Sequence, residues 1–167
     1  LLVKNCNYST ENFLMNLIIR KASNNDINTI VTFNYLMAKE TETILLDKNI
    51  VKLGVKSVIT NPSKAQYWIA ENNNEIIGQL MVTYEWSDWR NGDMWWIQSV
   101  YVTENFRRRG VFSALYKHIE HMAKENPGCC GIRLYIEKHN KRAQKTYLSL
   151  GMNDAGYDVM EVDFTKH

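Results

Sequence analysis

Runs of apolar, β-branched and aromatic residues alternate with short polar segments along most of the chain, and this pattern predicts a series of strands. The expected strands cover residues 13–20, 66–70, 75–84, 94–102, 131–137 and 157–164. The last of them is predicted from the alternation of apolar and polar residues in YDVMEVDF. Polar turns at 71–74 and 87–92 separate three consecutive strands, so we expect these strands to form two successive hairpins.

The segments between these strands show the spacing of amphipathic helices, with apolar residues on one face. The expected helices cover residues 24 to about 39, 48–61, 110–124 and 141–150. Ser23, Asp47 and Asn140 precede three of them and are expected to accept hydrogen bonds from first-turn N–H groups. Asp26 stands in the capping-box position after Ser23. Between the first two helices, residues 38–43 (AKETET) are expected to form an acidic link.

The elements follow the order β-α-α-β-β-β-α-β-α-β. A strand, a helix and another strand in succession favour parallel pairing through a crossover, whereas the hairpins are antiparallel. The predicted fold class is therefore α/β (α+β mixed), a mixed sheet with helices packed against it. We expect one domain over residues 13–167, preceded by a flexible arm over residues 1–12.

The composition is that of an ordinary soluble globular protein, with 45% hydrophobic and 23% charged residues among 167. No run of about 18 apolar residues is present, so no membrane association is expected. The 20 basic and 18 acidic residues give a net charge of +2, which argues against nucleic acid as the main partner. The three cysteines, Cys6, Cys129 and Cys130, are odd in number and lack metal-ligand spacing. We therefore expect a reducing, cytoplasmic compartment and no metal.

The segment RRRGVF follows the fourth strand and begins a helix, and this arrangement predicts an anion site. The first N–H groups of a helix lack partners within the helix and carry the positive end of its dipole. Gly110 has no Cβ, so a phosphate can approach the backbone closely. A solvated cluster of arginines is the alternative interpretation. A phosphate-bearing ligand is the function that this segment favours.

Two motifs at their expected spacing resemble the GCN5-related N-acetyltransferase (GNAT) family. The family signature Q/R-x-x-G-x-G/A is matched by Arg107 and Gly110, while Phe112 stands where the family has Gly or Ala. The second segment, N-x-x-A-x-x-x-Y, is matched by Asn140, Ala143 and Tyr147, with Gly151 following it. The resemblance covers roughly residues 14–164, and the order of the elements agrees with it.

The resemblance implies an acyl-CoA N-acyltransferase fold, with a mixed six- to seven-stranded sheet, about four flanking helices, and a splay between the fourth and fifth strands. It implies acetyl-CoA as acetyl donor, with the pantetheine arm along the fourth strand and the pyrophosphate at the following helix. The implied cofactor-binding residues are Val100, Tyr101, Val102, Arg107, Arg108, Arg109, Gly110, Val111, Phe112, Ser113, Asn140 and Ala143. It also implies a backbone N–H near the fourth strand as oxyanion donor, but the sequence does not identify the residue.

Two residues are candidates for proton transfer. The resemblance gives Tyr147 the role of general acid, which would protonate the departing CoA thiolate. A core tyrosine on a helix face is the alternative. Glu85, at the end of the third strand, is our candidate for the base that deprotonates the acceptor amine, and the alternative is a rim glutamate in water.

Candidate acceptor-binding residues lie in the acidic link and on the second hairpin: Glu40, Glu42, Trp86 and Gln98. The tryptophans of this hairpin can wall an acceptor pocket, or they can serve packing or a homodimer contact. Trp95 and Trp96 are adjacent on a strand and should face opposite sides of the sheet, so both cannot line one pocket.

The function that the sequence favours is transfer of an acetyl group from acetyl-CoA to the primary amine of a small molecule, by direct attack. Three alternatives remain open at this point: a catalytically idle CoA-binding module, an acetyltransferase of protein or peptide amines, and a nucleic-acid binder.

Overall fold

The computed structural model describes residues 16–41, 43–137 and 140–164. The chain divides into two compact units, Leu1–Tyr135 and Ile136–His167, and each is described by itself. The expected arm over residues 1–12 lies outside the described residues. The single domain expected over residues 13–167 therefore stays a prediction.

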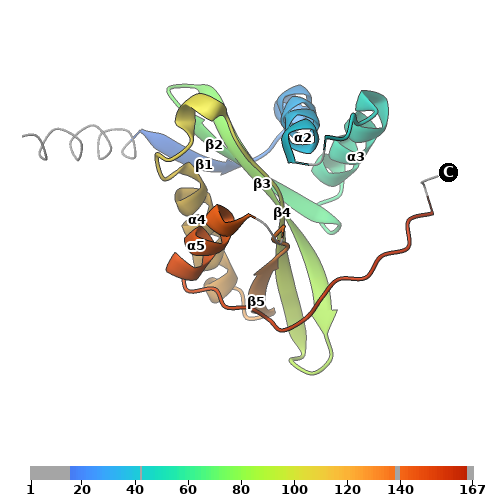
Figure 1. Cartoon of the computed structure of the whole chain (residues 1–167), viewed down its shortest axis with the longest axis vertical. Helices are drawn as coiled ribbons and strands as arrows, with labels where there is room; N and C mark the ends of the chain where they lie inside the picture. Colours follow the sequence, from blue (N-terminus) through green and yellow to red (C-terminus); the bar gives the residue numbers. More distant parts are fainter. Residues whose placement is uncertain (1–15, 42, 138–139, 165–167) are drawn as a thin grey trace, which may run out of the picture. The chain divides into compact units, whose positions relative to one another are not determined.

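The first unit is built on a five-stranded sheet in the order β1-β2-β3-β4-β5 (Figure 1). The strands are β1 (Leu17–Lys21), β2 (Ala65–Asn72), β3 (Glu75–Ser87), β4 (Gly92–Val102) and β5 (Cys129–Leu134). The first four strands pair antiparallel with their neighbours, and β4 pairs parallel with β5. The predicted mixed sheet and its two successive hairpins are thus confirmed.

The helices of the first unit begin near the residues that the sequence predicted. They are η1 (Asn24–Asp26), α2 (Ile27–Thr41), α3 (Lys48–Thr60) and α4 (Val111–Glu125), together with a short helix that was not predicted, η2 (Glu104–Phe106). The Asp47 carboxylate accepts from the N–H groups of Asn49 and Ile50, at 2.7 and 3.4 Å, and so caps α3 as predicted. None of the described helices is long and apolar enough to cross a membrane.

The helices cover opposite faces of the sheet (Figure 1). Tyr67 and Ile69 of β2 belong to a buried cluster with Ile30 and Val31 of α2 and Val55 of α3. The intervening Trp68 points the other way, because side chains alternate along a strand, and its ring lies 4.6 Å from that of His118 in α4. One face of the sheet therefore packs against α2 and α3, and the other packs against α4.

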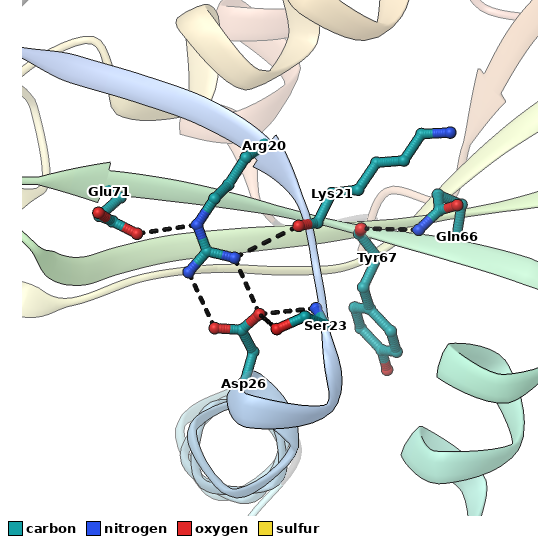
Figure 2. Close-up of polar contacts among 7 residues, drawn as sticks. All are labelled: Arg20, Lys21, Ser23, Asp26, Gln66, Tyr67 and Glu71. Atoms are coloured by element: carbon teal, nitrogen blue, oxygen red, sulfur yellow. Dashed lines mark hydrogen bonds and ion pairs between the residues drawn. The ribbon is translucent and has the colours of Figure 1, made fainter.

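An ion-pair network joins β1, β2 and the start of the first helix (Figure 2). The Arg20 guanidinium donates to both carboxylate oxygens of Asp26, at 2.8 and 2.9 Å, and to Glu71 at 2.8 Å. Asp26 also accepts from the backbone and hydroxyl of Ser23, which confirms the predicted capping box. The Arg20 hydrogen bond, with help from Ser23, lowers the pKa of the Asp26 carboxyl to about 2.

Two predictions of secondary structure are wrong. Residues 157–164 form no strand, and their apolar side chains are exposed, Met160 to 95%. Alternation predicts a strand only where a neighbouring strand supplies the hydrogen bonds, and this segment pairs with none among the described residues. Glu40 lies in the last turn of α2, which runs to Thr41, and so does not belong to a link. The helix continues through residues 39–41 because this stretch contains no glycine or proline that would end it.

Candidate active site

The turn that leads into α4 has the backbone shape of an anion site. Arg108 and Gly110 have φ angles of 65° and 83°, in the left-handed region. Gly110 is the N-cap, and its carbonyl accepts the hydrogen bond of Ala114 at 2.9 Å. The N–H groups of Val111 to Ser113 come before this first helical bond, at the positive end of the helix dipole. The geometry expected for a phosphate cradle is therefore present.

Arg107 ties this turn to the end of β4. Its Nε donates to the Val102 carbonyl at 2.9 Å, and its Nη2 donates to the Glu40 carboxylate at 2.6 Å. The guanidinium also lies 5.5 Å from the centre of the Tyr101 ring. In this arrangement Arg107 fixes the turn through Val102 and Glu40. The guanidinium of Arg109 lies 5.4 Å from the centre of the Phe106 ring.

Phe112 stands where the family pattern has a small residue, and its side chain packs against a neighbouring side chain of α4. The side chain is half-buried, and its ring lies 6.2 Å from that of Tyr116, one turn further along α4. The side chain therefore packs along the helix that follows the turn.

A β-bulge interrupts β4 where the family places the pantetheine arm. Gln79 pairs with Tyr101 and Met81 pairs with Gln98, so Leu80 of β3 faces both Ser99 and Val100. Ser99 has a φ of 50°, which is uncommon for a residue other than glycine.

Beyond Ile97, β4 leaves its parallel neighbour. The ladder between the two strands ends at the pair Ile97–Leu134, while β4 continues to Val102. The last residues of β4, 98–102, therefore have no partner in the described part of β5. This is the splay that was expected between the fourth and fifth strands, and Val100, Tyr101 and Val102 lie along it.

Glu85 lies in a cluster of aromatic and charged side chains. Its Oε2 accepts from Trp96 Nε1 at 2.6 Å, and its Oε1 accepts from Arg133 at 3.2 Å. The Trp96 ring stacks on Tyr135 at 4.5 Å and has the Arg133 guanidinium 5.7 Å from its centre. Both carboxylate oxygens are thus engaged, and the side chain is half exposed. Each carboxylate oxygen has a second lone pair, so Glu85 keeps a site at which it can accept a proton.

The strand register tells which predicted residues share a face of the sheet. Glu85 lies on the same face as Thr83, and Gln98 donates to the Thr83 hydroxyl at 2.7 Å. Trp86 is adjacent to Glu85 on β3, so it lies on the opposite face, 61% exposed. Of these candidates, the structure groups Glu85 with Gln98 and separates Trp86 from them. Trp95 packs edge-on against Tyr84, on the face opposite Trp96, as predicted.

Glu40 reaches the same side of the sheet from α2. It accepts from the Tyr101 hydroxyl at 3.3 Å as well as from Arg107. The other acidic candidate of this segment, Glu42, lies outside the described residues. Glu40 therefore links α2, the end of β4 and the turn before α4.

The second unit holds the segment that resembles N-x-x-A-x-x-x-Y. Asn140 caps α5 (Lys141–Ser149), and its side-chain oxygen accepts from the Ala143 N–H at 3.0 Å. Burial raises the pKa of the Tyr147 phenol above its ordinary value of 10.0, so the phenol keeps its proton at neutral pH. Gly151 follows with a φ of 85° and ends the helix. The predicted helix and both of its end signals are confirmed.

Three buried polar residues near the bulge, Asn34, Tyr67 and Gln79, were not among the predicted site residues. Gln79 is the one polar residue in the stretch IIGQLMV, and Asn34 interrupts an apolar helix face. A polar residue at a core position is the signal that points to them. Among the described residues, no group of three or more His, Cys, Asp and Glu side chains is placed to hold a metal.

A mixed sheet whose fourth strand passes through a bulge into a glycine turn at a helix start defines the acyl-CoA N-acyltransferase class. The sequence model of the acetyltransferase (GNAT) family matches residues 35–152, and the chain belongs to this family.

Individual proteins agree with this assignment. A possible acetyltransferase from Clostridium difficile 630 is 41% identical, with a TM-score of 0.82 over 88% of this chain and 97% of that chain. A predicted acetyltransferase from Clostridium acetobutylicum, crystallised with acetyl-CoA, has a TM-score of 0.71 over 90% of this chain and 98% of that chain. Its identity of 21% shows a shared fold alone.

A curated relative matches over a shorter stretch. Thialysine N-epsilon-acetyltransferase from Bos taurus is 28% identical over 79 residues, which are 47% of this chain and 45% of that protein. The chain thus spans about half the length of this relative.

Proposed function

We propose that this protein is an N-acetyltransferase that moves the acetyl group of acetyl-CoA to the primary amine of a small molecule. The observation that carries the proposal is the course of β4, which passes a bulge, leaves β5 and enters the turn of Arg108 and Gly110 at the start of α4. The extended pantetheine arm can hydrogen-bond with the free edge of a strand, and the pyrophosphate can bind the free N–H groups at the start of a helix. Family membership supports this assignment.

The donor would lie along β4 and its following turn. The pantetheine arm is expected to pair with the backbone of Val100 to Val102. The pyrophosphate is expected at the N–H groups that begin α4, with Ser113 and the arginines 107–109 as further donors. In this role Arg107 keeps the turn in place, through its bonds to Val102 and Glu40.

The reaction is a direct transfer. The neutral amine nitrogen attacks the thioester carbon, the bond between carbon and sulfur breaks, and the CoA thiolate takes up a proton. Tyr147 is the proposed proton donor, because its buried phenol is protonated at neutral pH. Glu85, directly or through water, is the proposed acceptor of the proton lost by the amine. A backbone N–H of β4 is the proposed donor to the oxyanion. One such donor stabilises the transition state of an acyl transfer by about 3 kcal/mol.

A small amine is the favoured acceptor. The curated relative is named for acetylating the epsilon nitrogen of thialysine, an amine of this class. On the α2 side of the sheet, Gln98 is the proposed neutral polar contact, and Glu40 and Glu85, each paired with an arginine, are the proposed acidic contacts of the amine. A protein or peptide amine is the alternative acceptor, and a homodimer through the exposed tryptophans and a cytoplasmic location stay expectations.

Calorimetric titration with acetyl-CoA tests the donor half of the proposal. We expect saturable binding of one acetyl-CoA per chain, with competition by CoA. A protein that gives neither heat of binding nor a thermal shift with acetyl-CoA contradicts the proposal. An idle CoA-binding module would bind acetyl-CoA and release no thiol with any amine, so amine-dependent thiol release separates the two.

A further inference from the structure

A network of buried polar side chains lies directly beneath the bulge of β4, on the side of α2. Gln79 Nε2 donates to Asn34 Oδ1 at 2.7 Å, and Asn34 Nδ2 donates to the Tyr67 hydroxyl at 3.0 Å. The three side chains come from β3, α2 and β2, and Gln79 is fully buried. The network thus connects three elements at one point of the core.

The same network contacts two polar groups of Ser99, its carbonyl and its hydroxyl. Gln79 Nε2 donates to the Ser99 carbonyl at 3.3 Å, and the Tyr67 hydroxyl hydrogen-bonds with the Ser99 side chain. Ser99 has a φ of 50°, a conformation that a serine adopts only where its surroundings hold it there. These two contacts provide such a restraint.

The direction of the next N–H follows from this contact. A trans peptide unit is planar, and its C=O and N–H bonds point in opposite directions. The Ser99 carbonyl points into the core, toward Gln79. The N–H of Val100, in the same peptide unit, therefore points away from the network. Val100 lies where β4 has left the ladder with β5, along the path proposed for the acetyl-bearing arm.

We propose that Gln79, Asn34 and Tyr67 are positioning residues, which orient the Ser99–Val100 peptide so that the Val100 N–H faces the thioester oxygen. The inference rests on the proposed function and identifies the oxyanion donor that the sequence left open. None of the three side chains touches the reacting atoms. They act through the peptide unit of the bulge.

The hydrogen bonding of Gln79 shows that packing alone does not explain a glutamine at this position. Its Oε1 is buried and has no hydrogen-bond partner among the described residues, which is a cost to the folded state. Methionine has a similar volume and no unsatisfied oxygen, so it would serve packing at least as well. The function of the glutamine is therefore in the hydrogen bonds of its Nε2.

The variant Gln79→Met tests positioning in a protein that is still folded. We expect its melting temperature to fall, because Asn34 Oδ1 and the Ser99 carbonyl lose a buried donor, so kcat is compared well below the melting temperature of the variant. We expect kcat to fall about tenfold or more, with KM for acetyl-CoA within about twofold of wild type, because a misdirected oxyanion donor affects the transition state. Tyr116→Phe, which removes the hydroxyl of a buried tyrosine in α4, is the control and should keep wild-type kcat.

Two further measurements decide the inference. The double variant Gln79→Met/Tyr67→Phe is compared with the two single variants. Its fold-reduction in kcat should be smaller than the product of the two single fold-reductions, because both residues act on one peptide unit. The Val100 amide resonance of the substrate-free protein should shift in Gln79→Met and stay in place in Tyr116→Phe. An unchanged kcat together with an unchanged Val100 resonance in Gln79→Met overturns the inference. If the wild type turns over no amine, the proposed function fails, and the Val100 resonance alone still decides whether the network orients the bulge.

Discussion

Gly110 adopts a φ of 83° at the start of α4, where a Cβ would strain the backbone and approach a bound phosphate. We predict that Gly110→Ala weakens acetyl-CoA binding about tenfold or more, measured by calorimetry. Gly151→Ala is the matched control, because Gly151 has a φ of 85° and, in the described part of the chain, no heavy atom lies within 4 Å of an added Cβ. It carries the same backbone strain at a position that the proposal does not give to the cofactor. Equal affinities in the two variants would remove Gly110 from the phosphate site.

Tyr147 is the residue on which the proposed proton donation depends. The phenol is protonated at neutral pH already at its ordinary pKa of 10.0, and burial raises this pKa further. We predict that Tyr147→Phe lowers kcat about 100-fold while acetyl-CoA binding stays near the wild-type value, because the ring is kept and only the proton donor is lost. The thiol released per unit time, at saturating donor and acceptor, measures the effect. A Tyr147→Phe enzyme with wild-type kcat would exclude the general-acid role.

At the scale of elements, the Arg20–Asp26–Glu71 network joins β1, β2 and the start of the first helix (Figure 2). The Asp26 pKa of about 2 lies below its ordinary value of 3.8, chiefly through the Arg20 hydrogen bond. The charged form therefore stabilises the fold above about pH 4, and this contribution is lost as the pH falls through 2. Its size is about 2 kcal/mol.

We predict that Asp26→Asn lowers the free energy of unfolding at pH 7 by about 2 kcal/mol, measured by urea denaturation. The difference between wild type and variant should shrink as the pH is lowered from 4 toward 2. Glu75→Gln, a change at an exposed residue of β3, serves as control. A difference that stays constant from pH 7 to pH 2 would show that the Asp26 charge does not carry the effect.

Elements with local signals could be predicted from the sequence. Asp47 and Asn140 cap the helices that follow them, as expected for short polar side chains before an apolar stripe. Asn73 and Asn74, with φ angles of 50° and 64°, make the two-residue turn between β2 and β3, slightly tighter than the predicted turn at 71–74. These caps and turns are determined by residues adjacent in the chain, so the sequence alone is enough to predict them.

Features that depend on tertiary contacts could not be predicted. The bulge at Ser99 arises from a register shift between two strands and has no local marker. The exposed segment 157–164 has the alternation of a strand, but pairing is a property of the folded chain. Glu85 was predicted as a residue in the site, while its ion pair with Arg133 follows from β5 lying beside β4.

At the scale of the whole molecule, the central claim is acetyl transfer to a small amine. The most direct measurement is CoA thiol release by the full chain with acetyl-CoA and a panel of amino acids, polyamines, aminoglycosides and peptides. We predict amine-dependent release above the rate of hydrolysis for a small amine, no comparable rate with peptides, and a lower rate for Glu85→Gln. Acetyl-CoA binding without amine-dependent thiol release for any member of the panel would contradict the claim and favour an idle CoA-binding module.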